Sequence, residues 1–245
     1  MKFIFSFLSG LFLVTTSLGQ SMPIQQIKVG LLTGLNVSKF NRDVEGFGSA
    51  IPKNGLGYDN YFRISGSIGV TFSYRLKRYF EPSVELLYTG RGMAYRRENS
   101  SVILIGEKGA EKAYNYYKYN INFIQLPLLA NLVVNPTGRN NLKLYGGLAP
   151  ELVGASKTRI SSYSSSPMSP AHETSSDTPL EGVRRFNCEL HAGFKVDDAS
   201  NHSIKSSIGF RGGYTLLPVF TGEQSSAGNL KTQMLSLSFN IGMLF

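Results

Sequence analysis

The final stretch of the chain, LSLSFNIGMLF from Leu235 to Phe245, alternates between two kinds of side chain. Every second position is apolar, and the residues between them are Ser, Asn or Gly until Leu244. A period of two places each set on one face of a β-strand, whereas a helix would scatter both sets around its circumference. The pattern therefore predicts a strand with one continuous apolar face.

The same alternation recurs upstream, for example in FRISGSIGVTFSYR from Phe62 to Arg75. Segments of this kind predict eight strands in the whole chain. Their approximate positions are residues 27–38, 61–75, 79–95, 115–134, 140–155, 183–197, 203–217 and 230–245. The fourth segment changes phase near Phe123, so we expect a β-bulge there, and Pro127 lacks the amide hydrogen that a regular ladder requires.

The composition excludes several classes of protein. Of the 245 residues, 26 are Gly, 13 are Tyr and 16 are Phe, and only 17% are charged, which argues against a disordered chain. One Cys and three widely spaced His do not supply a zinc or His-rich metal site, so we expect neither metal nor cofactor. Beyond the N-terminal region, no segment has the ~18 uninterrupted apolar residues of a membrane-spanning helix.

The N-terminus has the pattern of an export signal. Met1-Lys2 is followed by an apolar run that reaches Val14, and the small residues Ser17 and Gly19 precede Gln20. This order is typical of a secretory signal peptide. We therefore expect residues 1–19 to be a signal peptide and residues 20–245 to form the mature domain.

The connections between the predicted strands alternate in length. The longer ones are residues 39–60, 96–114, 156–182 and 218–229, and the short ones are residues 76–78, 135–139 and 198–202. Outer-membrane barrels are organised in this way, with long outer loops and short periplasmic turns. The sequence thus predicts an all-β fold, an eight-stranded antiparallel up-and-down transmembrane β-barrel in the bacterial outer membrane, with both termini in the periplasm.

The less apolar faces of the strands carry charges of both signs. In a narrow barrel these faces would point inward, and the charges would fill the lumen as a network of ion pairs. The candidate lumen residues are Arg63, Glu81, Glu85, Arg91, Lys143, Glu151, Glu189, His191, Lys195 and Arg211. The opposite assignment is a lipocalin-like cup with an apolar interior, but lipocalins usually carry a Gly-x-Trp motif and this chain has no Trp.

Several segments in order resemble the PorT-like outer-membrane β-barrel proteins of Bacteroidetes. They are Val29–Ser38, Phe80–Tyr88 followed by Gly90 and Gly92, Asn122–Leu129, and Leu144–Pro150. The chain departs from the family pattern at three positions, with Phe123 in place of Tyr, Leu126 in place of Ile and Ala149 in place of Gly. The resemblance implies an outer-membrane barrel, and the family takes its name from a member linked to protein secretion and maturation.

The chain end also resembles a known signal. Phe245, with Met243 and Ile241 at alternate positions before it, is similar to the C-terminal strand that the barrel-assembly machinery reads. Membrane lipid is therefore an expected partner together with that machinery. The basic residues in the third connection, residues 96–114, and at the start of the strand after it could contact lipopolysaccharide phosphates, and nucleic acid is not expected. These basic residues are Arg96, Arg97, Lys108, Lys112 and Lys118.

Three functions remain open at this point. The first is a non-enzymatic structural or interaction protein that contacts a partner through its long loops, with a link to protein secretion or surface assembly. The second is a narrow solute pore, which the charged lumen opposes. The third is a lipid-modifying enzyme, for which Ser162, Ser164 and His172 are the nearest candidates in a Ser-rich segment that we expect to be a loop.

Overall fold

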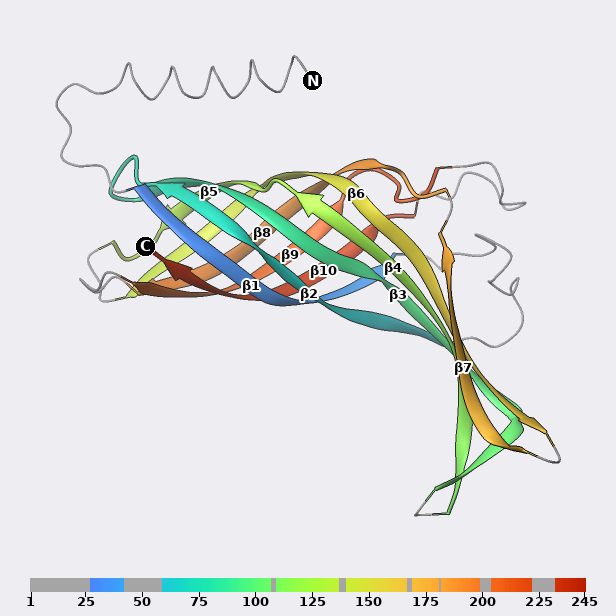
Figure 1. Ribbon diagram of the computed structural model, residues 1–245. Coiled ribbons are helices and arrows are strands. Elements are labelled where there is room, and N and C mark those ends of the chain that lie inside the picture. The colour runs from blue at the N-terminus through green and yellow to red at the C-terminus, as the bar shows by residue number, and fades with distance from the viewer. Residues whose placement is uncertain are drawn as a thin grey trace.

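The computed structural model describes residues 27–41, 59–106, 109–136, 140–166, 169–180, 182–198, 204–221 and 232–245. The expected signal peptide, residues 1–19, lies outside this part of the chain. Within the described residues, no helix is long and apolar enough to cross a membrane. The secondary structure consists of strands, as the sequence predicts (Figure 1).

The strands are numbered in chain order. They are β1 (Ile27–Phe40), β2 (Asp59–Tyr74), β3 (Phe80–Gly106), β4 (Gly109–Gln125), β5 (Leu128–Val133), β6 (Asn140–Ser166), β7 (Ser169–Pro179), β8 (Phe186–Asp198), β9 (Lys205–Thr215) and β10 (Met234–Leu244).

These strands close into an antiparallel ring with eight positions. Around the ring β1 is followed by β2, β3, the pair β4 and β5, β6, β8, β9 and β10, and β10 pairs with β1 again. At the seam the Phe245 amide donates to the carbonyl of Val29 at 2.7 Å, and the Val29 amide donates back at 3.4 Å. The predicted eight-stranded barrel is confirmed.

The two faces of the wall differ as the alternation predicts. Apolar side chains point outward on every side of the ring, and Leu31, Ile68, Leu132, Leu190 and Ile241 are each at least 46% exposed. The side chains between them point inward and are mostly buried. Such apolar rows on the outside of a closed sheet suit contact with acyl chains.

The fourth ring position differs in detail from the expectation. The ladder breaks at Leu126 and Pro127, but the extra residue of the bulge is Gly154 in β6, because Asn122 faces Ala155 while Phe123 faces Val153. The alternation within β4 is therefore unbroken. The sequence changes phase only because apolar residues of β4 near Phe123 face the interior and are buried there.

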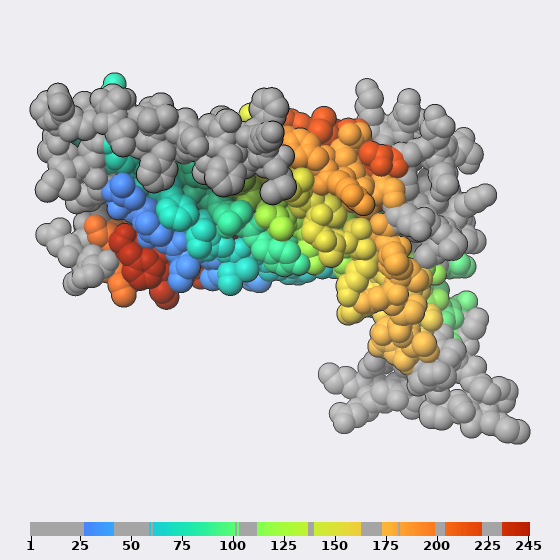
Figure 2. Space-filling view, turned by 45° about the horizontal axis from the view of Figure 1, so that its top comes forward, coloured from blue at the N-terminus to red at the C-terminus, as the bar shows by residue number. Residues whose placement is uncertain are grey.

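The predicted long loops 96–114 and 156–182 are instead mostly β-hairpins. β3 and β4 continue past the ring as one hairpin, β6 and β7 form another, and β4–β6 pairing from Asn120 to Tyr116 joins them. We call this four-stranded sheet the extension: residues 94–106, 109–120, 157–166 and 169–179. It leaves the end of the barrel opposite the C-terminus and turns aside from the barrel axis (Figure 1), and it protrudes beyond the barrel in Figure 2 as well.

The interior has two layers. Near the extension it is filled by an apolar cluster, and the remainder is polar and charged. We call this cluster the apolar plug: Phe40, Met93, Tyr95, Tyr119, Ile121, Phe123, Leu180, Val219, Phe220 and Met234. Its rings meet at tilted or edge-on angles, with centroids 5.4 Å apart for Phe40 and Phe220. Such contacts stabilise a packed core.

Candidate functional site

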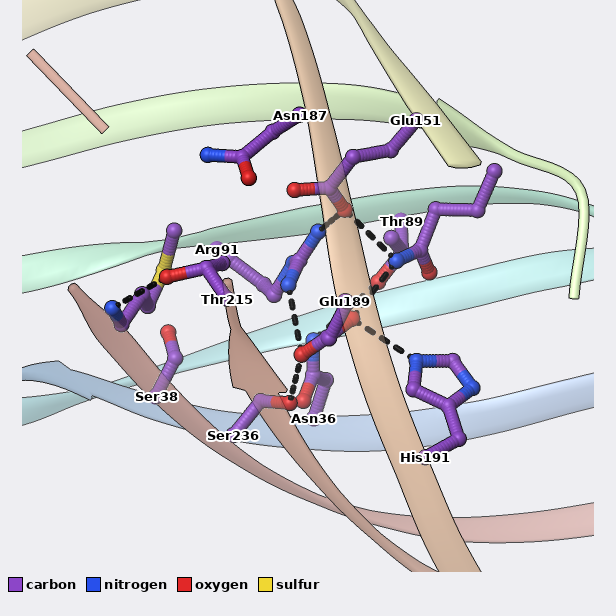
Figure 3. A network of polar contacts seen from close by, with 12 residues as sticks. Asn36, Ser38, Thr89, Arg91, Glu151, Asn187, Glu189, His191, Thr215 and Ser236 are labelled. Atoms are coloured by element: carbon purple, nitrogen blue, oxygen red, sulfur yellow. Dashed lines mark hydrogen bonds and ion pairs between the residues drawn. The ribbon is translucent and has the colours of Figure 1, made fainter. Parts of the chain in front are cut away.

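The charged interior begins directly beneath the apolar plug with Arg91. Its guanidinium lies between Glu151, to which Nη2 donates, and Glu189, whose Oε1 is 2.8 Å from Nη1 (Figure 3). The same guanidinium stacks on the Phe123 ring, 4.2 Å from its centroid. Arg91 is only 1% exposed, so its charge is compensated by these two carboxylates and the ring rather than by water.

Neutral groups complete the bonding of the two carboxylates. Gln125 Nε2 donates to Glu151 Oε2 at 2.8 Å and to Glu189 Oε2 at 2.7 Å. Ser236 donates to Glu189 Oε1, and His191 Nε2 lies 2.8 Å from Glu189 Oε2. In Figure 3 the side chains of Glu151, Glu189, His191 and Ser236 converge around Arg91. The cluster around Arg91 therefore ties five strands of the wall, β3, β4, β6, β8 and β10, together across the lumen.

A second ion pair lies further from the plug. Arg211 Nη2 donates to Glu85 Oε2 at 2.6 Å, and Arg211 Nε donates to the Tyr145 hydroxyl at 3.4 Å. That hydroxyl donates to the carbonyl of Phe210 at 3.1 Å. Lys195 also approaches Tyr145, with its Nζ 5.8 Å from the centroid of the Tyr145 ring.

A third cluster lies nearest the start of β1 and the C-terminus. Lys143 Nζ contacts Glu81 Oε1 and lies 2.5 Å from Asp197 Oδ2. Lys28 Nζ is 3.3 Å from Glu81 Oε2, and Ser207 donates to Asp197 at 2.7 Å. Both carboxylates are thus bonded in a fully buried site, as buried charges require.

The structure places most of the candidate lumen residues in these three clusters, but two differ. Lys195 points into the interior, yet among the described residues it makes no ion pair within 4 Å. Arg63 is half-buried beside Gly92, and within the described part of the chain no carboxylate pairs with it.

Sequence reasoning missed several members of the interior. They are Lys28, Gln125, Tyr145, Asp197, Ser236 and the apolar plug. Lys28 could have been found, because it alternates with the apolar residues Ile27 and Val29 in the first strand. Asp197 is the last residue of the predicted strand 183–197, but it is not among the candidate lumen residues, whereas in the structure it is buried near the end of β8.

The remaining space in this interior is small. One void, between Arg211, Lys195 and Tyr145, has a volume of about 20 Å³, enough for about one water molecule. Among the described residues, no three His, Cys, Asp or Glu side chains are placed to hold a metal ion. The arrangement is that of a packed and cross-linked core.

The serine and histidine candidates lie in the extension. The β6–β7 register places Ser164 opposite His172 and Ser162 opposite Thr174. Opposed positions alone do not make a catalytic site, because nucleophilic catalysis also needs an oriented base and donors for the developing oxyanion.

The extension carries exposed ion pairs. Asp177 accepts hydrogen bonds from Arg159 Nε at 2.8 Å and from Lys157 Nζ at 2.6 Å, and these bonds hold the pKa of Asp177 well below its usual value. The same bond raises the pKa of Arg159. Further out, Lys112 is 3.0 Å from Glu98, which raises the pKa of Lys112 through their hydrogen bond.

Several solved structures are similar to this chain. Ail of Yersinia pestis, in complex with the heparin analogue sucrose octasulfate, is 13% identical over 90% of this chain and 99% of that chain, with a TM-score of 0.38. Neisserial surface protein A is 13% identical over 88% of this chain and 95% of that chain, also with a TM-score of 0.38. No curated protein sequence matches this one.

The family comparison covers most of the sequence. The family model described as "Outer membrane protein beta-barrel domain" matches residues 19–220. The strand β10 that closes the ring lies beyond the matched region. With a closed eight-stranded ring and apolar rows on its outside, the chain belongs to the outer-membrane β-barrel domain family and is a bacterial outer-membrane protein.

Proposed function

We propose that this chain is a non-enzymatic outer-membrane protein that recognises a partner at the cell surface through its extension. One observation carries the proposal: the extension is a hydrogen-bonded sheet of four strands rather than a set of loops. A sheet presents side chains in a fixed arrangement, so less conformational entropy is lost on binding than with flexible loops.

The proposal requires the extension to face outward and both termini to face the periplasm. The loop lengths support this orientation, because the short connections between β2 and β3 and between β5 and β6 lie at the same end as the start of β1 and the C-terminus. Short turns of outer-membrane barrels lie in the periplasm. Residues 1–19 would direct export to that compartment.

Insertion would depend on the barrel-assembly machinery. The signal residues Ile241, Met243 and Phe245 are exposed on the outer face by 46%, 57% and 57%. Their side chains are therefore accessible for recognition before lipid covers them. The seam bonds between Phe245 and Val29 would form last, when the ring closes.

A PorT-like role would make the partner a component or client of a protein secretion or surface-assembly system. Support for this finer assignment comes from the motif segments. In the first of them, Asn36 donates to Thr89 and Gly90, and Ser38 exchanges hydrogen bonds with Gly92. These motif residues thus join β1 to β3 across the interior, which favours a shared barrel architecture.

The two alternatives make different predictions. A pore would need the apolar plug and the ion pairs beneath it to move, so we expect no steady conductance in planar lipid bilayers. A lipid-modifying enzyme would act through the opposed positions Ser164 and His172. In that case deletion of the gene would change the lipid A structure seen by mass spectrometry, whereas we expect it unchanged.

The direct test removes the extension and keeps the ring. In one variant a two-residue Asn-Gly turn replaces residues 97–115, and in a second it replaces residues 158–178, so that each hairpin closes near the ring. Deletion of the whole segment 156–182 is the more severe version. We expect all three to insert and to keep heat-modifiable gel mobility, but to lose the partner captured by crosslinking in intact cells. Retained capture would contradict the proposal.

A further inference from the structure

The outward face of the extension continues the lipid-facing surface of the barrel. The β3–β4 register runs without interruption from Leu87 to Glu98, so side chains alternate without a change of phase. In the ring, Tyr88 and Ile124 face outward and are 48% and 47% exposed. The even-numbered residues beyond them share this outward face, including Ala94, Arg96, Tyr116 and Lys118.

The path of the extension brings it to the membrane surface. The four strands turn aside from the barrel axis where they leave the ring (Figure 1). Since the barrel axis crosses the bilayer, a sheet that turns aside runs along the membrane surface. The face that meets lipid along the ring therefore continues onto a sheet that lies at the membrane surface.

Like charges lie side by side on this face at the base of the extension. Lys118 of β4 is directly opposite Arg159 of β6, and Lys157 lies two positions before Arg159 on the same strand. In the part of the chain that the structure describes, the one carboxylate that pairs with this group is Asp177, which contacts Lys157 and Arg159. Among the described residues, no carboxylate lies within 4 Å of Lys118.

This group, which we call the basic cluster (Lys118, Lys157 and Arg159), carries a net positive charge. Three cations and one carboxylate leave an excess of two charges. Like charges directly opposite each other on neighbouring strands destabilise a sheet unless an anion lies between them. Lys118 has the small residue Ala94 on its other side, so its ammonium group is open to an external ligand.

Aromatic rings surround the same region. The guanidinium of Arg96 lies between Tyr61 and Tyr114, 4.4 Å and 4.5 Å from their ring centroids. Lys118 Nζ is 5.3 Å from the centroid of Tyr116. Tyr side chains concentrate at the headgroup level of membranes, where the ring meets lipid and the hydroxyl meets water.

We propose that the basic cluster binds phosphate groups of outer-leaflet lipids and holds the extension against the membrane surface. The inference rests on the proposed role of the extension in recognition, because the lipid would set the orientation in which a partner meets it. The position of the basic cluster favours lipid phosphate over a soluble anion, since the cluster adjoins the apolar rows of the barrel.

The test uses the mature protein folded in detergent micelles, with binding measured by native mass spectrometry. The probes are bisphosphorylated lipid A, lipid A from which both phosphates have been removed, and inorganic phosphate. Each basic residue at an anionic lipid surface strengthens binding about fivefold. We therefore expect Lys118→Gln to weaken binding of bisphosphorylated lipid A about fivefold, and Lys118→Gln with Arg159→Gln about 25-fold.

Lys112→Gln is the matched control, because Lys112 lies on the same strand and face but is paired with Glu98. We expect it to bind lipid A like the wild type, with heat-modifiable mobility showing that all variants are folded.

Equal binding of bisphosphorylated lipid A by the double variant and the wild type, or equal binding of dephosphorylated and bisphosphorylated lipid A, would overturn the inference. Tight binding of inorganic phosphate alone would overturn it in favour of a soluble anion. Partner crosslinking on the same variants separates the two proposals: capture retained without lipid binding would leave the proposed function standing.

Discussion

The ring and the extension use the same chemical pair in two environments. In the ring, Arg91 lies between Glu151 and Glu189 with almost no exposure to solvent. In the extension, Arg159 binds Asp177 with about half of its side chain exposed. Water screens the second pair but not the first, so the cost of breaking each should differ greatly. The comparison indicates that stability resides in the ring, while the extension is free to vary its surface.

The largest effect is expected from Arg91→Met. Removing the guanidinium leaves Glu151 and Glu189 buried together, since Arg91 is the one cation that pairs with both among the described residues. Breaking a buried ion pair by removing one partner costs about 3–5 kcal/mol. Urea unfolding of the protein in lipid vesicles should show a loss of this size.

A triple variant tests whether the unpaired buried carboxylates cause this loss of stability. Arg91→Met with Glu151→Gln and Glu189→Gln removes all the charges at once, and we expect it to recover most of the lost free energy of unfolding, because neutral groups of similar size then fill the site. A single Arg91→Met variant as stable as the wild type would show that water compensates these carboxylates.

The next largest loss of stability is expected at Gly92, where the ring and the extension join. Its φ of 150° is uncommon for residues with a side chain, and a Cβ there would overlap the carbonyl oxygen of Tyr119 and lie 3.1 Å from Arg63 Cδ. Backbone strain of this kind costs about 1–3 kcal/mol, so Gly92→Ala should lower the free energy of unfolding by about 2 kcal/mol.

Gly66→Ala serves as the control for this position. Its Cβ would meet only the carbonyl oxygen of Gly34 at 3.9 Å, an ordinary contact. The same urea titration should find this variant close to the wild type. Equal losses at both positions would mean that glycine flexibility, rather than the close approach of β4, sets the cost.

The ring was predictable because lipid on one side and a narrow lumen on the other impose a period of two on every strand. Segments such as Leu235–Phe245 show that period plainly. The extension was not predictable on the same grounds. β7 reads SPAHETSSDTP, which has no apolar face, so its strand character depends on pairing with β6 rather than on burial.

The interior site was predictable as a set of inward charges but not as a set of pairs. Arg211 meets Glu85 across 126 residues of sequence, and only the register of every strand between them decides that meeting. The plug was missed for a different reason. Phe123 is apolar and faces the lumen, which conflicts with the rule that apolar residues face lipid. The sequence pattern therefore predicted a bulge at that position.

A smaller effect is expected when the extension is shortened. In the variants with turns in place of residues 97–115 or 158–178, the ring keeps its interior ion pairs and its seam. The free energy of unfolding should therefore change by less than about 1 kcal/mol, the range of exposed contacts. The same vesicle unfolding assay checks this. A loss as large as that of Arg91→Met would show that the extension stabilises the barrel.

The smallest effect is the pH dependence of the β6–β7 hairpin. Bonds from Arg159 and Lys157 hold the pKa of Asp177 below the ordinary value of about 4. A carboxyl group with a depressed folded-state pKa stabilises the fold above its unfolded pKa, and this contribution is lost as pH falls through the folded pKa.

Hydrogen exchange, corrected for intrinsic rates, should thus show constant β7 protection from pH 7 to about 4 and a decline at lower pH. Asp177→Asn should give the low protection throughout, while β8 amides in the ring stay unchanged. If β7 protection in the wild type were flat down to pH 2, or matched that of the variant, the exposed pairs would contribute nothing to the stability of the hairpin. Only the buried pairs of Arg91 would then stabilise the fold.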